Sequence, residues 1–442
     1  MTQIQSSTQL STLGPTHTLA QWLSRLEALH PTEIELGLDR VRSVAERLPI
    51  KSQAVKFVVA GTNGKGSTCA MLEAILLASG WRVGMYTSPH LIDFNERARI
   101  NGKVVDDQTF VDAFVQIEAA RADTSLTYFE FTTLAVLLIF AQHKLDAWVL
   151  EVGLGGRLDA VNLIDADCSI VTSVALDHQA WLGNDRESIG WEKAHVYRSG
   201  CPAICADPEP PESLVNYANE IGADLWLVGR DYNYSGDRQQ WAFAGRNGRR
   251  NALAYPALRG ANQLLNAAGA LAALDSLRHR IPVTQQAVRE GLLQAALPGR
   301  FQILPGQPLV ILDVGHNPHA AAVLEQNLGN MGFHPYTYAV FGMMADKDID
   351  DVVGHLAKRI DGWFCASLPG SRAMPGQALA DKVQSVIQRQ LPSDDQQRTV
   401  ASYDSVAQAY EAACQRATPD DRIVVFGSFL TVAGVLQKLA RH

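Results

Sequence analysis

Residues Ala60 to Thr68, with the sequence AGTNGKGST, have the types and spacing of a phosphate-binding turn. They follow the apolar run 57–59 and precede a segment of helical composition, 69–78. Three glycines allow the backbone to turn tightly and to direct N–H groups at an anion, and Lys65 adds a positive charge. We therefore predict a strand, a turn that binds a nucleotide phosphate, and a helix.

The turn departs from the usual nucleotide-binding pattern. That pattern has a glycine separated by four residues from the Gly-Lys pair, and Ser or Thr directly after the lysine. Here Val59 and Gly66 occupy those two positions, and Ser67 and Thr68 follow slightly later. A tight connection without a ligand is therefore the alternative to a phosphate site.

Polar side chains also lie near the ends of other apolar segments. In open parallel α/β sheets, ligands bind beyond the carboxyl ends of the strands. A serine hydroxyl and a carboxylate are oxygen ligands of the kind that suit Mg²⁺, which joins a nucleotide to the protein. We therefore predict a metal and nucleotide site beside the turn, formed by Ser88, Glu151, Asp177 and His178.

Each of these residues also has a purely structural explanation. Glu151 can pair with Arg157 or Lys193, and His178 can satisfy hydrogen bonds in the core. Lys193 lies in a short predicted helix, and read alone it has the character of a surface lysine. The residue types by themselves leave both explanations open.

The elements that position these residues alternate between apolar strands and amphipathic helices. We expect helices at 19–29, 108–121, 131–141 and 261–277, strands at 81–91, 147–152 and 167–178, and a small antiparallel hairpin at 232–255. The segment 92–107 has few apolar residues, and we interpret it as a functional loop or a flexible surface connection. Residues up to about Pro15 are expected to form a flexible arm.

Chain length favours two domains. A chain of 442 residues exceeds the size at which a single core stops growing. Pro298 and Gly299 interrupt a helical segment, so we place the domains at 1–297 and 298–442. After this boundary, strands and helices alternate again, which is typical of a parallel sheet.

Composition excludes several classes of protein. A net charge of -8 and a pI near 5.8 argue against a nucleic-acid partner. The longest apolar stretch, 131–141, is too short to cross a bilayer, and the polar N-terminus has no signal-peptide core. Six scattered cysteines form no disulfide or zinc pattern. We expect a cytoplasmic protein without a membrane partner.

Motifs spread over nearly the whole chain point to one family. In order they are AGTNGKGST, TSPHL with FNERARING, LTYFEF, LEVGLGGRLDAVN, TSVALDHQAWLG, WEKA, LPGRFQ, DVGHNPHA and FGMMADKD. Together they resemble the folylpolyglutamate synthase family, which is related to the Mur amide ligases. The resemblance implies an α/β fold, with an N-terminal P-loop ATPase-like domain that has a mostly parallel sheet and a smaller C-terminal Rossmann-like domain.

The resemblance also implies an activity. Members of the family are ATP-dependent ligases that join L-glutamate to dihydropteroate or to reduced folates through an acyl phosphate. ATP and Mg²⁺ are the implied cofactors, with two metal ions and K⁺ as a further candidate, and a monomer is the expected state. The alternatives are folylpolyglutamate synthase activity alone, a Mur-type amino-acid ligase, a nucleotide hydrolase or kinase, and a regulator that binds a nucleotide.

Matching positions assign roles to individual residues by the same resemblance. ATP contacts fall on Thr62, Asn63, Gly64, Lys65, Gly66, Ser67, Asn266, Arg300 and Asp313. The metal ligands are Ser88, Glu151, His178 and Lys193, the last of them carbamylated, and the catalytic residues are Lys65, Lys193 and His316. Pterin contacts fall on Leu36, Gly37, Leu38, Asp39, Thr127, Tyr128, Phe129, Glu130, Leu158, Asp159 and Ala160. The family commonly has His-Gln where this chain has Asn262-Gln263, so Asn262 receives no role.

Overall fold

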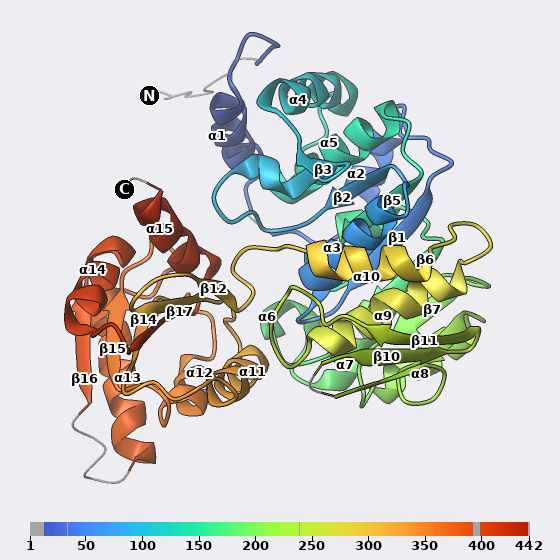
Figure 1. Cartoon of the computed structure of the whole chain (residues 1–442). Coiled ribbons are helices and arrows are strands. Elements are labelled where there is room, and N and C mark those ends of the chain that lie inside the picture. Colours follow the sequence, from blue (N-terminus) through green and yellow to red (C-terminus); the bar gives the residue numbers. More distant parts are fainter. Residues whose placement is uncertain (1–12, 33, 238, 392–397, 441–442) are drawn as a thin grey trace, which may run out of the picture.

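The computed structural model describes residues 13–32, 34–237, 239–391 and 398–440. The chain forms a larger lobe, coloured blue to yellow in Figure 1, and a smaller lobe, coloured orange to red. Most of the arm expected before Pro15 lies outside the described residues. No helix in the described ranges is long and apolar enough to cross a membrane.

An eight-stranded sheet forms the centre of the larger lobe. Its strands are β1 Val55–Ala60, β2 Val83–Tyr86, β3 Ala98–Ile100, β4 Lys103–Val104, β5 Ala147–Glu151, β6 Cys168–Val171, β7 Pro202–Cys205 and β8 Asp224–Leu227. Their order is β4-β3-β2-β5-β1-β6-β7-β8, in which β3 forms antiparallel pairs with β2 and β4 and all other pairs are parallel. The chain passes from β5 on one side of β1 to β6 on the other, so β1 lies at the switch point where ligands bind in such sheets.

Helices cover both faces of this sheet. They are α1 Leu19–Leu29, α2 Asp39–Ala45, α3 Lys65–Ala78, α4 Asp107–Arg121, α5 Tyr128–Gln142, α6 Gln179–Leu182, α7 Arg186–Ala194, α8 Glu212–Glu220, α9 Gln263–Ser276 and α10 Gln285–Gln294. Side chains alternate along β1 because successive residues of a strand point to opposite faces. Val55, Phe57 and Val59 pack in the core beneath α3, α9 and α10, whereas Val58 and Ala60 pack in the core with α4 and α5.

The segment 92–107 is more regular than expected. It contains the 3₁₀ helix η1 Phe94–Arg97, followed by β3 and β4, which extend the edge of the sheet. The interpretation as a flexible surface connection was therefore wrong, whereas the interpretation as a functional segment stays a prediction. These strands are too short to show alternation, although the Asn101-Gly102 turn between them, with both φ angles positive, is a hairpin signal.

A separate three-stranded antiparallel sheet packs against α9. Its strands are β9 Asn233–Gly236, β10 Trp241–Gly245 and β11 Gly248–Leu253, in the order β11-β10-β9. The hairpin predicted at 232–255 is therefore present, with one additional strand.

The smaller lobe contains a six-stranded sheet. Its strands are β12 Gln302–Leu304, β13 Leu309–Leu312, β14 Thr337–Phe341, β15 Gly362–Ala366, β16 Thr399–Tyr403 and β17 Arg422–Phe426, in the order β12-β13-β17-β14-β15-β16. All pairs are parallel except β12 with β13. Its helices are α11 Pro318–Gly329, α12 Ile349–Leu356, α13 Gly376–Gln390, α14 Val406–Arg416 and α15 Phe429–Leu439. The first three share one core and the last two share the other, so both faces are covered and the predicted α/β class is confirmed.

Candidate active site

The turn after β1 leads directly into the N-terminus of α3, with Gly64 as the residue before its first turn. Gly61 and Gly64 have φ angles of 144° and 90°, and residues other than glycine rarely adopt such backbone angles. Helix α3 begins at Lys65, four residues before the expected start at 69, because the polar residues of its first turn hide the helical pattern. The Lys65 ammonium donates to the Gly61 carbonyl at 3.1 Å, so its charge lies over the turn.

Glu151 lies beside this turn because of the strand register. It ends β5 directly opposite Val59 on β1, and its side chain is almost completely buried. The Ser88 N–H donates to Glu151 Oε2 at 3.0 Å. Burial raises the pKa of the Glu151 carboxyl, and the charges of Lys65 and Arg300 oppose that effect.

The structural explanation considered for Glu151 was wrong. Arg157 pairs with Glu192 at 2.9 Å, and neither Arg157 nor Lys193 forms an ion pair with Glu151 within the described residues. Glu151 thus keeps its second carboxylate oxygen for another partner.

Lys193 is buried, contrary to the surface lysine that its local sequence suggests. It lies near the end of α7 with 4% of its surface exposed. Burial and the nearby charge of Lys65 lower the pKa of Lys193 to about 7. Over the described parts of the chain, no hydrogen bond or ion pair is formed by its side chain. Near neutral pH a substantial fraction of this amine is therefore in its neutral, nucleophilic form.

His178 and Asp177 follow β6 and face the same space. His178 has a φ angle of 53° and caps α6, and burial lowers the pKa of its imidazole to about 4. Burial alone would raise the pKa of the Asp177 carboxyl, but the charges of His178, Lys347 and His316 lower it below the ordinary value. Asp177 is therefore a fixed negative charge beside the turn.

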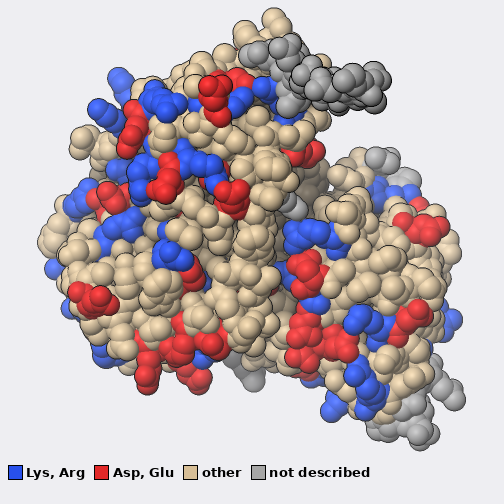
Figure 2. All heavy atoms as spheres, turned by 180° about the vertical axis from the view of Figure 1, so that it is seen from behind, with Lys and Arg blue, Asp and Glu red and all other residues tan. Residues whose placement is uncertain are grey.

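A cavity of about 460 Å³ brings these residues together between the lobes. On the larger lobe it is lined by Thr62, Lys65, Gly66, Ser88, His90, Glu151, Asp177, His178 and Lys193. On the smaller lobe it is lined by Arg300, His316, Met344, Lys347, Arg372, Ser428 and Phe429. All four predicted metal ligands and all three predicted catalytic residues thus border one space. The lobes meet along a furrow that is visible from behind in Figure 2.

A second cavity, of about 640 Å³, adjoins the first. Both are lined by Asn63, Gly64, Arg300 and His316, so they meet at the turn. Three further predicted ATP contacts, Ser67, Asn266 and Asp313, line the second cavity alone. Together the two cavities are lined by all nine residues predicted to contact ATP.

Side chains pack closely around the turn where the two cavities meet. A Cβ atom on Gly64 would lie 2.5 Å from Asn266 Oδ1, so only glycine fits against that side chain. Arg300 stacks over the Phe429 ring at 5.1 Å. Asn262 also lines the second cavity, while the neighbouring Gln263 donates to Ser67 Oγ at 3.4 Å.

His316 lines both cavities, and its Nε2 lies 3.7 Å from Asp177 Oδ2. Its Nδ1 lies 2.9 Å from the Val314 carbonyl oxygen, which can only accept, so Nδ1 carries the proton. Burial lowers the pKa of the imidazole, which leaves the ring neutral and Nε2 an acceptor.

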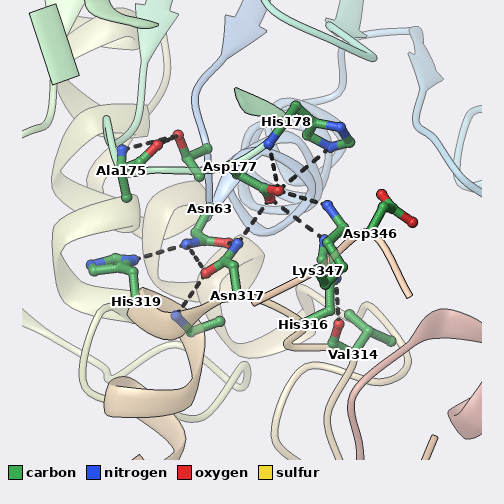
Figure 3. Close-up of polar contacts among 12 residues, drawn as sticks. Asn63, Ala175, Asp177, His178, Val314, His316, Asn317, His319, Asp346 and Lys347 are labelled. Carbon is green, nitrogen blue, oxygen red and sulfur yellow. Dashed lines mark hydrogen bonds and ion pairs between the residues drawn. The ribbon is translucent and has the colours of Figure 1, made fainter. Parts of the chain in front are cut away.

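Five residues, which we call the interlobe network, join the lobes at this point (Figure 3). They are Asn63 and Asp177 of the larger lobe, and Asn317, His319 and Lys347 of the smaller lobe. Lys347 Nζ lies 2.6 Å from Asp177 Oδ1, and Asn317 donates to Asp177 Oδ2 at 3.1 Å. The amides of Asn63 and Asn317 exchange two hydrogen bonds of 3.1 Å, and Asn63 also donates to His319 at 2.8 Å.

Sequence reasoning assigned no role to the smaller-lobe members of this network. Lys347 lies in FGMMADKD and Asn317 in DVGHNPHA, so both motifs were visible. Their partners lie 170 and 254 positions away in the sequence, and local sequence patterns do not predict contacts at that separation.

The three segments predicted to contact the pterin also come together, but outside the two cavities. Helices α2, α5 and the 3₁₀ helix η2 Ala160–Leu163 contact one another. Thr127 and Glu130 form a capping box at the start of α5, and Glu130 pairs with Arg40 at 3.0 Å. Burial raises the pKa of Asp159, which caps η2, to about 6. Several of these side chains therefore have structural contacts of their own.

Comparisons with known proteins agree with this architecture. Residues 299–429 match the family model for the Mur ligase glutamate ligase domain. The chain is 46% identical to the dihydrofolate synthase/folylpolyglutamate synthase of Escherichia coli K12, over 95% of both chains. The chain therefore belongs to the dihydrofolate synthase/folylpolyglutamate synthase family.

Solved structures of relatives have the same fold. An E. coli FolC in complex with DHPP and ADP superposes with a TM-score of 0.91 at 45% identity, covering 97% of this chain and 99% of that chain. A bifunctional folylpolyglutamate synthase/dihydrofolate synthase with Mn, AMPPNP and L-glutamate bound gives 0.88 at 46% identity, covering 97% of this chain and 100% of the other.

Proposed function

We propose that this protein is an ATP-dependent carboxylate-amine ligase that joins L-glutamate to dihydropteroate and to reduced folates. The observation that carries the proposal is the pair of cavities meeting at the phosphate-binding turn. One has the lining predicted for a nucleotide, and the other combines a buried carboxylate, an imidazole and an unpaired amine. Relatives of the same length with bound ADP, AMPPNP, DHPP or L-glutamate support it.

Chemistry requires the acceptor carboxylate to be activated, because its oxygen is a poor leaving group. A carboxylate oxygen attacks the γ-phosphorus of ATP, the bond to ADP breaks, and an acyl phosphate forms. The glutamate amine then attacks the acyl carbon, phosphate leaves, and the nitrogen loses a proton. Negative charge develops in the transition states of both steps, and Lys65 and the N–H groups of the turn stabilise those transition states.

The donor set also fits divalent metal ions, for which we propose Mg²⁺. Ser88 and Glu151 supply a hydroxyl and a carboxylate beside the turn, and His178 supplies a neutral imidazole. Bound there, the metal would add positive charge where the phosphates lie. Two ions can be held if Lys193 contributes oxygen ligands, and K⁺ is a further candidate.

Lys193 becomes an oxygen ligand if it is carbamylated. Its neutral amine attacks CO₂, a nitrogen–carbon bond forms, and a proton is released, which leaves a carboxylate at the end of the side chain. The buried, unpaired amine with its lowered pKa supports this step. Mass spectrometry that finds only unmodified Lys193 in the active, metal-bound protein would contradict it.

We place the substrates on opposite sides of the turn. The pterin would contact α2, the start of α5 and η2 of the larger lobe. L-Glutamate brings two carboxylates, and Lys347 and Arg372 carry positive charge on the smaller-lobe wall of the 460 Å³ cavity. His316 Nε2, as a neutral acceptor in that wall, can take up the proton that the amine loses.

A parallel assay tests the proposal. The protein is incubated with ATP, Mg²⁺ and labelled glutamate, together with either dihydropteroate or tetrahydrofolate, and the amide product is identified by mass. We expect product from both acceptors. Product from one alone would reject dual activity, while ATP turnover without glutamate would favour a hydrolase. Ligation of a Mur-type acceptor in preference to either would indicate a peptide ligase.

A further inference from the structure

Arg97 is a buried cation near the proposed site. It ends η1 directly before β3, and 8% of its surface is exposed. Its carbonyl accepts a hydrogen bond of 3.0 Å from the Thr87 N–H, which ties its backbone to the end of β2. The position of its guanidinium is therefore defined by the sheet.

Two aromatic rings and an imidazole surround the Arg97 guanidinium. Its central carbon lies 5.6 Å from the centre of the Phe94 ring and 5.7 Å from that of Tyr128, within the range of cation–π attraction. Arg97 Nε donates to His90 Nδ1 at 2.9 Å. His90 lines the 460 Å³ cavity, and its pKa is lowered to about 4 by burial and then by Arg97, so it accepts as a neutral ring.

Within the described residues Arg97 forms no ion pair with a carboxylate, although its charge is near enough to Glu151 to lower the pKa of that carboxyl. A guanidinium has five N–H donors, and only the bond to His90 uses one of them in the described part of the chain. Arg99, two residues further on, instead pairs with the buried Glu73 at 2.9 Å. A buried charge without a directly paired carboxylate is costly, so the four remaining donors of Arg97 are suited to an anionic ligand.

The position of Arg97 indicates which anion. Tyr128 belongs to a segment that we propose contacts the pterin, and His90 lies two residues after the proposed metal ligand Ser88. Arg97 therefore lies between the place expected for the pterin ring and the place where its carboxylate must react. Arg97 itself lines neither cavity that meets the turn, but its hydrogen-bond partner His90 lines the 460 Å³ cavity.

We infer that Arg97 binds the carboxylate of the pterin acceptor and directs it toward the γ-phosphate of ATP. The planar fork of two N–H groups matches a carboxylate better than a point charge does. The inference rests on the proposed function, since it assumes an acceptor of that class.

Binding measurements with matched ligands test it. The probes are pteroate and its uncharged carboxamide, measured with the wild-type chain, Arg97→Gln and a control, Arg82→Gln. Arg82 is half-exposed and pairs with Asp146 at 2.8 Å on the surface. We expect the wild type and the control to prefer the acid by about 10- to 100-fold, the range for hydrogen bonds between charged groups. Arg97→Gln should lose most of that preference and keep its affinity for ATP.

An unchanged preference in Arg97→Gln would overturn the inference, and so would an equal loss for acid and carboxamide, which indicates a structural role. If Arg97→Gln does not fold, Arg97→Lys replaces it, and a preference as large as that of the wild type overturns the inference. A wild type that binds neither pteroate nor its amide, and forms no amide product, would instead refute the proposed function.

Discussion

The individual residues at the centre of the molecule are charged groups removed from water. Glu151, Lys193 and Asp177 are largely buried, and their pKa values are shifted in the directions that burial and neighbouring charges dictate. Such groups are costly unless a ligand or a partner uses them, so their convergence on one cavity is the strongest local sign of a catalytic site.

Lys65 should be essential for turnover. Substitution of Lys65 by Ala removes the charge that faces the developing negative charge on the phosphates. We expect ligation to fall by a factor of about 10² or more, equal to about 3 kcal/mol of transition-state stabilisation. Lys103→Ala, at an exposed position of β4, is the control and should keep full activity. Near-normal turnover of Lys65→Ala would refute the role of the turn.

Gly64 should be required for nucleotide binding beyond its effect on stability. Gly64 and Gly80 have similar φ angles, 90° and 84°, but a Cβ atom would meet Asn266 only at Gly64. We expect Ala at either position to lower the free energy of unfolding by about 1 kcal/mol through backbone strain. Only Gly64→Ala should also lose ATP affinity in a titration. Equal ATP affinities for the two variants would contradict this expectation.

Among the elements, the first turn of α5 combines a structural and a proposed binding role. Thr127 caps the helix, and the same turn carries Tyr128, which contacts Arg97. The 92–107 segment, expected to be a functional loop or a flexible surface connection, reaches this turn through η1 and adds two strands to the sheet.

Thr127→Ala should affect both stability and acceptor binding. Loss of the cap should lower the free energy of unfolding by about 1 kcal/mol, measured by denaturant titration. Thr284→Ala, which removes the cap of α10, is the matched control and should lower stability alone. We expect only Thr127→Ala to raise the KM for the pterin acceptor. An unchanged KM would restrict Thr127 to its capping role.

For the molecule as a whole, the relation of the two lobes is the central property. The two cavities are lined from both sides, so neither lobe forms the site alone. The interlobe network joins the lobes through the hydrogen bonds between Asn63, Asp177, Asn317, His319 and Lys347 that are drawn in Figure 3, including the short Lys347–Asp177 ion pair. Closure of the lobes around substrates would exclude water from the acyl phosphate.

Lys347→Met should loosen the junction in the absence of ligands. The substitution leaves Asp177 without its nearest cation, so we expect a larger radius of gyration in small-angle X-ray scattering. Lys382→Met, which breaks an ion pair with Asp350 inside the smaller lobe, is the control and should scatter like the wild type. Identical scattering from Lys347→Met and the wild type would show that the ion pair does not hold the lobes.

Local patterns predicted most of the elements and the position of the phosphate turn. Glycine spacing, apolar strands and helical periodicity are properties of neighbouring residues, so they can be recognised without knowledge of tertiary contacts. The strands β3 and β4 escaped because two or three residues are too few to show a period, and the true start of α3 escaped because its first turn has no apolar side chain. The domain boundary at 297/298 remains a prediction, although α10 ends at Gln294 and the second sheet begins at Gln302.

The sequence by itself determined the α/β class, the glycine-rich turn after β1 and the residues at the strand ends, because each depends on chemistry within a few positions. Only the tertiary structure decided that Lys193 is buried with no side-chain partner among the described residues, that Glu151 does not pair with Arg157, and that Asp177 meets Lys347 across the lobes. Burial and electrostatic pairing depend on atoms brought together from distant parts of the chain, and folding alone defines that proximity.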